Sequence, residues 1–172
     1  LYTNKAYRAH IASRNNKQTI MLGFSDGTKD GGYLMANWAI FKAKEQLTSI
    51  SKQYDVDVIF FDGRGGPPAR GGGKTHQFYA SLGPTIADKE VQFTIQGQTI
   101  SSNFGIPESA RYNLEQLISS GIVNKFANDK AGIPSEDIKT MDKLALKSYE
   151  TYTNFKNQPM CIRYLERMST LK

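Results

Sequence analysis

Residues Val56-Asp57-Val58-Ile59-Phe60-Phe61 form a short apolar run, and Asp62-Gly63-Arg64-Gly65-Gly66 follows it directly. A run rich in β-branched and aromatic side chains predicts a buried strand. A second basic glycine turn, Arg70-Gly71-Gly72-Gly73-Lys74, comes shortly afterwards. Glycine permits close backbone approach, and the planar fork of arginine suits carboxylate and phosphate oxygens. The pattern predicts an anion pocket after the strand; the alternative is a basic surface loop, which the stiffening pair Pro67-Pro68 disfavours.

The sequence before this strand predicts parallel α/β architecture. Gln18 to Phe24 is a second short apolar run, and Tyr33 to Tyr54 between the two runs carries apolar residues three and four apart. This spacing predicts a long helix with one buried face. The expected inward residues are Tyr33, Ala36, Ile40, Ala43, Leu47, Ile50 and Tyr54. Strand, long helix, strand is typical of parallel sheets.

The rest of the chain predicts one more strand and several helices. Val91 to Ile95 is the third strand, and helical turns are expected within Thr75 to Leu82. Further helices are expected from Pro107 to a stop at Gly121, from Ile138 to Tyr152, and from Pro159 onward. We treat residues 1–172 as a single partial domain with a flexible break near residues 128–135.

Composition limits the possible partners and the setting of the protein. Lys+Arg 22 against Asp+Glu 16 gives a net charge of +6, which favours anionic partners without requiring nucleic acid. A single cysteine, Cys161, excludes an internal disulfide and favours a reducing compartment. No apolar stretch approaches the roughly 20 residues of a membrane helix. Both ends of the sequence suggest a fragment of a longer protein, because Leu1 replaces an initiator methionine and helical patterning continues towards Lys172.

Three motif alternatives fail on spacing or context. Gly73-Lys74-Thr75 resembles the end of a phosphate-binding P-loop, but Pro68 stands where that loop needs its first glycine. Asp26 begins a calcium-loop-like pattern, but Asn37 occupies the position of the bidentate glutamate. The two Arg-Gly-Gly triplets are flanked by strongly apolar segments, unlike disordered RNA-binding tails.

Polar, glycine-marked sequence follows each of the three expected strands. Ser25 to Asp30 follows the first strand, Asp62-Gly63-Arg64 and Arg70 follow the second, and Gln96-Gly97-Gln98 follows the third. Ligands of parallel α/β proteins bind outside the carboxyl ends of the strands. These segments therefore predict one shared site.

At these positions the sequence resembles phosphoenolpyruvate carboxylase. Gly23 to Asp30 is similar to the family signature G-[YF]-S-D-x-x-K-D. Phe61 to Gly72 resembles the F-H-G-R-G-G-x-x-x-R-G-G loop, and Val91 to Gly97 resembles the V-T-x-Q-G-E strand end. The motifs occur in the family's order, and the resemblance weakens after about Gly121. It suggests a bacterial-type member and a segment from the C-terminal half of the catalytic barrel.

The resemblance implies a carboxy-lyase. Enzymes of this family join bicarbonate to phosphoenolpyruvate and give oxaloacetate and phosphate, with Mg²⁺ or Mn²⁺ as cofactor, an anaplerotic form of carbon dioxide fixation. The fold it implies is a (β/α) barrel enlarged with helices, to which this chain would contribute about three parallel strands with long helices. It further implies a cytoplasmic homotetramer inhibited by aspartate or malate, with no nucleic acid or membrane as partner.

The resemblance also assigns roles to individual residues. It implies that Asp26 is a metal ligand and that Lys29 lies near bicarbonate. Arg64, with Gly65 and Gly66 beside it, would bind the substrate phosphate. Arg70 would stabilise developing charge, so the implied catalytic residues are Arg70, Lys29 and Arg64. Gln96 either lines the substrate site, as the resemblance implies, or satisfies nearby backbone at the end of its strand.

Two departures from the family pattern bear on the site. Asp62 replaces the usual histidine before Gly63-Arg64, and Gln98 replaces a glutamate. Because aspartate adds negative charge near an anion site, we expect it to pair with Arg64 or Arg70. Two function classes remain: a catalytic-core fragment that is inactive alone, or a non-catalytic phosphate-binding domain that uses the same loops.

Overall fold

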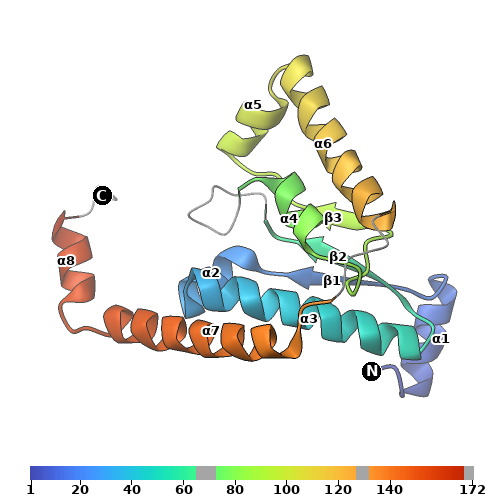
Figure 1. Ribbon diagram of the computed structural model, residues 1–172, viewed down its shortest axis with the longest axis horizontal. Helices are drawn as coiled ribbons and strands as arrows, with labels where there is room; N and C mark the ends of the chain where they lie inside the picture. Colours follow the sequence, from blue (N-terminus) through green and yellow to red (C-terminus); the bar gives the residue numbers. More distant parts are fainter. Residues whose placement is uncertain (65–72, 127–131, 169–172) are drawn as a thin grey trace.

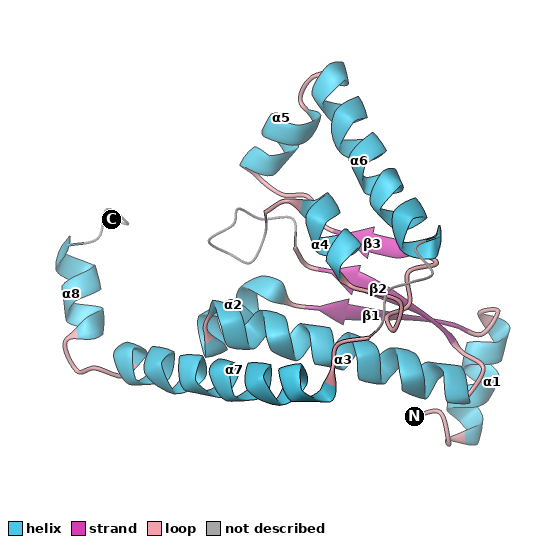
Figure 2. Ribbon diagram, in the orientation of Figure 1, coloured by secondary structure: helices cyan, strands magenta, loops and turns pink. Residues whose placement is uncertain are grey.

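The computed structural model describes residues 1–64, 73–126 and 132–168, which form a three-stranded parallel sheet with helices around it (Figure 1, Figure 2). The strands are β1 (Lys17–Leu22), β2 (Asp57–Asp62) and β3 (Val91–Phe93). The helices are α1 (Lys5–Ser13), α2 (Phe24–Gly31), α3 (Tyr33–Gln53), α4 (Thr75–Ser81), α5 (Gln98–Phe104), α6 (Pro107–Phe126), α7 (Ser135–Lys156) and α8 (Cys161–Met168).

The sheet has the order β1-β2-β3, and both pairs of strands are parallel. Leu22 pairs with Asp62, and Asp62 pairs in turn with Phe93. The three strands therefore end side by side, and the segments that follow them begin at one edge. The strand-helix-strand prediction of a parallel α/β fold is confirmed for these elements.

Helices α2 and α3 connect β1 to β2, and α4 lies between β2 and β3 in the chain (Figure 1). Helix α7 returns along α3, whereas α5 and α6 stand at the β3 side of the sheet (Figure 1). Apolar residues of β2 and α4 form the central core, with Val58 and Phe60 against Tyr79, Leu82 and Ile86. Within the described residues no helix combines the length and apolarity needed to cross a membrane.

Several predicted elements are confirmed, and others differ from the expectation. The strands and the helices α3, α4, α7 and α8 form where the sequence indicated them, with bounds shifted by a few residues. Gly121 does not end α6, which continues to Phe126. Glycine inside a helix costs only about 1 kcal/mol relative to alanine. The sequence pattern predicted neither α1, α2 nor α5, and most of the expected break at 128–135 lies outside the described residues.

The buried face of α3 matches the predicted apolar stripe only in part, since Ala36 is buried and Leu47 packs against the core. Tyr33 and Ile50 are exposed, whereas Lys44, Thr48 and Ser51 are each 1% exposed. These polar side chains can be buried because each has a partner. Lys44 donates a hydrogen bond to Asp62 at 2.6 Å, and the Thr48 hydroxyl accepts one from the backbone N–H of Ala87 at 3.1 Å. The Ser51 hydroxyl is hydrogen-bonded to that of Tyr2 at 3.2 Å. Buried polar groups need such partners, and partners on other elements are not visible in helical periodicity.

Helix α7 holds the junction of α2 and α3. Asp142 accepts hydrogen bonds from the indole N–H of Trp38 at 2.7 Å and from Lys42 at 2.5 Å, both on α3. The hydroxyl of Tyr152 donates to the carbonyl of Lys29 at 2.7 Å. Gly32 lies between the two helices with φ +79 and ψ 164, a conformation that is almost confined to glycine. A Cβ atom at Gly32 would lie 3.1 Å from Tyr152 Cγ.

We predict that Gly32→Ala destabilises the protein by about 1–3 kcal/mol, because alanine is strained in this backbone conformation. The added Cβ would also press on the Tyr152 side chain. Chemical denaturation of the intact protein measures the change. Gly121→Ala is the matched control, since its Cβ meets nothing within 4 Å in the middle of α6. A Gly32→Ala protein as stable as the control would contradict the prediction.

Candidate functional site

Asp62 is the last residue of β2 and the most buried polar residue at the carboxyl edge of the sheet. Its side chain is 0% exposed and lies on the same strand face as Val58 and Phe60, because strand side chains alternate. Its Oδ2 accepts hydrogen bonds from the Lys44 ammonium at 2.6 Å and from the Tyr79 hydroxyl at 2.9 Å. Oδ1 is also buried and has no hydrogen-bond partner among the described residues.

The backbone of Asp62 joins the second and third strands to the segment that carries Arg64. The Asp62 carbonyl accepts from the N–H of Arg64 at 2.8 Å and from the N–H of Thr94 at 3.1 Å. The N–H of Gly63 donates to the carbonyl of Leu22 at 2.9 Å, which ties the same turn to β1. A side chain at Gly63 would crowd that carbonyl, since a Cβ would lie 3.1 Å from it.

The expected pairing of Asp62 with Arg64 does not appear among the hydrogen bonds described for the Asp62 carboxylate, so it stays a prediction. The hydrogen bonds of its carboxylate go to α3 and α4, because the side chain points into the layer that these helices form. Arg70, the other expected partner, lies outside the described residues. Asp62 contacts Arg64 through its backbone carbonyl, and the charge of its side chain opposes the lowering of the Arg64 pKa by burial.

The Lys44 ammonium lies among aromatic rings as well as beside a carboxylate. It lies 5.0 Å from the ring centre of Phe60, 5.3 Å from that of Phe78 and 5.7 Å from that of Tyr79. A cation within about 6 Å of a ring face is attracted by the ring quadrupole. Burial lowers the pKa of Lys44 from its usual value, and the Asp62 carboxylate opposes that shift. Burial raises the pKa of Tyr79, and the neighbouring Asp62 charge adds to the rise.

Arg64 is 8% exposed and lies flat against aromatic side chains. Its guanidinium carbon is 4.2 Å from the Phe78 ring centre and 5.8 Å from that of Phe24, the first residue of α2. Burial lowers the pKa of Arg64 from its usual value, and the nearby Tyr33, Tyr79 and Asp62 oppose that shift. The rings fix the orientation of a cation whose hydrogen-bonding fork suits phosphate.

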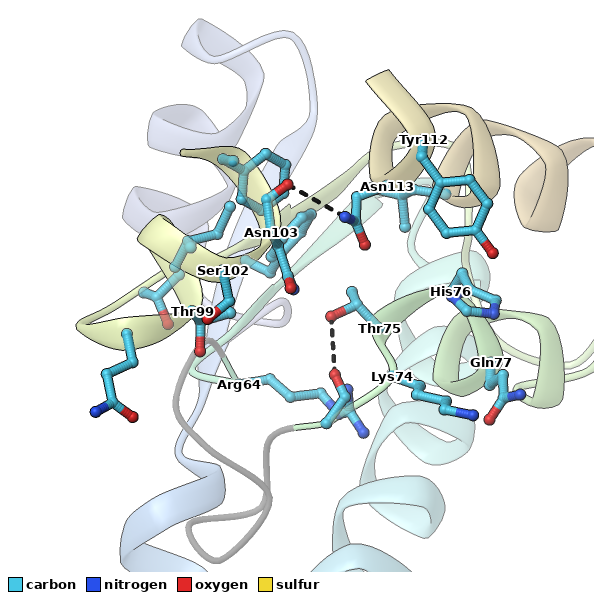
Figure 3. Close-up of a pocket in the computed structure, with 17 residues that line it drawn as sticks. Arg64, Lys74, Thr75, His76, Gln77, Thr99, Ser102, Asn103, Tyr112 and Asn113 are labelled. Carbon is cyan, nitrogen blue, oxygen red and sulfur yellow. Dashed lines mark hydrogen bonds between the residues drawn. The ribbon is translucent and has the colours of Figure 1, made fainter. Parts of the chain in front are cut away.

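A cavity of about 620 Å³ opens beside Arg64, between the start of α4, the end of β3 and the helices α5 and α6 (Figure 3). Its polar lining combines Lys74, Thr75 and His76 with amide side chains of Asn103 and Asn113. Asn113 donates to the backbone carbonyl of Asn103 at 3.1 Å, which joins α5 to α6 across the cavity (Figure 3). Cationic groups with amide and hydroxyl donors in one cavity favour an anion.

The predicted site residues fall into two groups. Arg64 lines the cavity, but Asp26 and Lys29 are in α2 with side chains 83% and 64% exposed and form an ion pair of 3.4 Å. Gln96 is exposed beyond β3 and does not line this cavity. Arg70, Gly65 and Gly66 lie outside the described residues. The described structure therefore brings only Arg64 to the cavity, and the roles assigned to all seven residues stay predictions.

The metal prediction rests on one carboxylate. Asp26 is well exposed, so its oxygens could fill one position around Mg²⁺ or Mn²⁺, which prefer oxygen ligands. Among the described residues no three His, Cys, Asp or Glu side chains converge as a metal site. Asp26 could thus supply one metal ligand, and the other ligands would have to come from residues outside the described part of this chain.

Sequence reasoning missed Lys44, Tyr79 and the contribution of α5 and α6. The only sequence signal for Lys44 is its position, three residues after Phe41 and three before Leu47, on an otherwise apolar face of the helix. His76 carried no motif, yet it lines the cavity because α4 begins next to it.

Comparisons with known proteins identify the family of this chain. The family model of phosphoenolpyruvate carboxylase matches residues 1–171. Relatives include phosphoenolpyruvate carboxylases of Rhodothermus marinus, 37% identical over 92% of this chain, and of Corynebacterium diphtheriae, 33% identical over 99%. A third, from Mycobacterium leprae, is 33% identical over 93% of the chain. The match continues well beyond Gly121, where the motif resemblance weakened. The chain spans 17–19% of the length of these relatives.

A parallel sheet that ends in a ring-stacked arginine beside a cationic cavity defines an α/β protein suited to binding an anion. The matched family gives this class a name. The chain belongs to the phosphoenolpyruvate carboxylase family.

We predict that Tyr79→Phe lowers the free energy of unfolding by about 1–3 kcal/mol, because it takes a donor from a buried carboxylate. Urea denaturation of the intact protein measures the difference. Tyr149→Phe removes a hydroxyl from a side chain that is 41% exposed and serves as the control. Equal stabilities of the two variants would show that the Tyr79 bond to Asp62 contributes nothing.

Proposed function

We propose that this chain forms part of the catalytic core of a phosphoenolpyruvate carboxylase, which carboxylates phosphoenolpyruvate with bicarbonate to give oxaloacetate and phosphate. The observation that carries the proposal is the position of Arg64. It is buried and stacked on Phe78 at the carboxyl edge of the sheet, beside a cationic cavity, in a chain matched by the family over residues 1–171. The complete active site needs more residues than this chain supplies, so the chain is expected to be inactive alone.

The reaction concentrates negative charge at each stage. Bicarbonate attacks the phosphorus atom, the phosphoryl group leaves the enol oxygen, and carboxyphosphate and the enolate of pyruvate result. Carboxyphosphate then splits into carbon dioxide and phosphate, and the enolate carbon attacks carbon dioxide. Preorganised cations stabilise such charge better in a closed site than in water, because they need not reorient during the reaction.

Each proposed residue then has a role. Arg64 binds the phosphate of the substrate with Gly65 and Gly66 at its side, Arg70 faces the charge that develops on carboxyphosphate, and Lys29 lies towards bicarbonate. The rings beneath Arg64 support its role by limiting its orientations. Gln96 either lines the substrate site or satisfies nearby backbone. Mg²⁺ or Mn²⁺, with Asp26 as one ligand, would supply Lewis-acid stabilisation of the phosphate and enolate oxygens.

Other features of the whole protein follow from the same proposal. The three strands would belong to a helix-enlarged (β/α) barrel, which accords with their parallel order and with the site at their carboxyl ends. The full enzyme would be a cytoplasmic homotetramer, with aspartate or malate as inhibitor. The unpaired edges of β1 and β3 in this chain would be covered by the remaining strands.

The alternative is a phosphate-binding domain without catalysis, which would accord with the absence of three converging His, Cys, Asp or Glu side chains among the described residues. The enzyme and the phosphate-binding domain differ in whether binding of the anion requires a metal ion. Binding of a phosphoenolpyruvate analogue to the intact protein, titrated with and without Mn²⁺, separates them. Binding that requires Mn²⁺ supports the enzyme, and binding of any phosphate without metal supports the alternative.

We predict that Asp26→Asn in the intact enzyme raises the Mn²⁺ concentration needed for half-maximal activity at least tenfold, because a neutral amide is a weaker ligand than a carboxylate. Stability should change little, since the side chain is 83% exposed. Metal titrations of activity and of analogue binding measure the effect. Asp30→Asn, in the same helix, is the control. An unchanged metal requirement in Asp26→Asn would refute its role as a ligand.

We predict that Arg70→Lys lowers kcat by about 10²–10³ while raising the KM for phosphoenolpyruvate much less, because loss of one preorganised donor acts mainly in the transition state. Lysine keeps the charge but not the fork of arginine. Steady-state kinetics on the intact enzyme measures both constants, and Lys52→Met on the exposed end of α3 provides a charge-removal control. A raised KM with unchanged kcat would assign Arg70 to ground-state binding.

A further inference from the structure

Lys44 is almost completely buried in the middle of α3. Its side chain is 1% exposed, and its ammonium donates to the fully buried carboxylate of Asp62 at 2.6 Å. Lysine and aspartate are rarely buried to this extent unless they are paired. The pair is separated by 18 residues and joins the helix layer to the carboxyl end of β2.

Stability alone is a weak reason for such a pair. Removing two charges from water costs about as much as their attraction returns, and well-packed apolar residues often replace a buried ion pair without loss. An apolar pair would also suit this place, which borders the apolar cluster of Phe60, Tyr79 and Leu82. The presence of charges here therefore points to a task other than holding the fold.

Two paths lead from Lys44 to Arg64. Along the first, Lys44 fixes the Asp62 side chain, and the carbonyl of Asp62 accepts the N–H of Arg64 at 2.8 Å. Along the second, the Phe78 ring has both cations near it, with the Lys44 ammonium 5.3 Å and the Arg64 guanidinium carbon 4.2 Å from its centre. Lys44 thus constrains both the backbone and the ring that set the orientation of Arg64.

We propose that Lys44, through its buried pair with Asp62, is a positioning residue that orients Arg64 towards the phosphate of phosphoenolpyruvate. Lys44 does not line the cavity beside Arg64, so it acts without touching the ligand. The inference deepens the proposed function and rests on the role of Arg64 in it. The Lys44–Asp62 pair is therefore expected to affect the binding of phosphoenolpyruvate and not the binding of bicarbonate.

The decisive variant is the double replacement Lys44→Met/Asp62→Asn in the intact carboxylase. It removes both charges together, keeps side chains of similar size and leaves an acceptor for Tyr79. Each single replacement leaves one charge buried without its partner, which by itself impairs folding. The double variant should regain the wild-type free energy of unfolding while the KM for phosphoenolpyruvate stays raised.

We expect that KM to rise about 10- to 100-fold, since a displacement near 1 Å can cost about 10²-fold. The KM for bicarbonate should remain at the wild-type value. Lys42→Met/Asp142→Asn is the matched control, because Lys42 lies on the same helix as Lys44 and its pair with Asp142 of α7, at 2.5 Å, is partly exposed. Its kinetic constants should equal those of the wild type.

The result that overturns the inference is a double variant in which stability and phosphoenolpyruvate KM change together. Recovery of both, or loss of both, would make the pair a folding element only. An equal rise in the KM for bicarbonate would also overturn it. Failure of the proposed function looks different, since the wild-type protein would then show no metal-dependent carboxylation or analogue binding at all.

Discussion

One buried ion pair connects the parts of this structure on which its chemistry depends. The Lys44–Asp62 contact joins α3 to the end of β2, and Tyr79 joins α4 to the same carboxylate oxygen. The backbone of Asp62 then extends the connection to Arg64 and to β3. Because Asp62 is fully buried, its partners must stay in place for the charge to be tolerated, and this requirement fixes the relative position of four elements.

The same constraint explains the rotation of α3 about its axis. If apolar contact alone set the orientation of the helix, Tyr33 and Ile50 would be buried, yet both are exposed. The polar residues Lys44, Thr48 and Ser51 are buried instead. Hydrogen bonds from other elements compensate each of these polar groups. The helix therefore presents specific partners to the sheet, and its apolar residues fill the space around them.

Local signals in the sequence were sufficient for the strands and for α3, α4, α6, α7 and α8, apart from the end of α6, because period and turn chemistry are carried by neighbouring residues. They also located Arg64 at the carboxyl end of a strand and led to the family. They did not reveal Lys44, because its partner lies 18 residues away and a buried lysine violates helical patterning. Nor did they reveal the cavity, whose walls include Asn103 from α5, a helix that the sequence did not predict, and Asn113 from α6. The roles of Asp26, Lys29 and Arg70 depend on groups outside the described residues.

The contact between Tyr152 and the carbonyl of Lys29 has a consequence for the order of events during synthesis. The two residues are 123 positions apart, and the contact fastens the end of α2, which carries Asp26 and Lys29. A ribosome adding about 5–20 residues per second needs on the order of 10 s to cover that distance. For this interval β1 and α2 have left the ribosome before the helix that fastens them exists. The segment with the proposed metal ligand is thus made well before the helix that secures it.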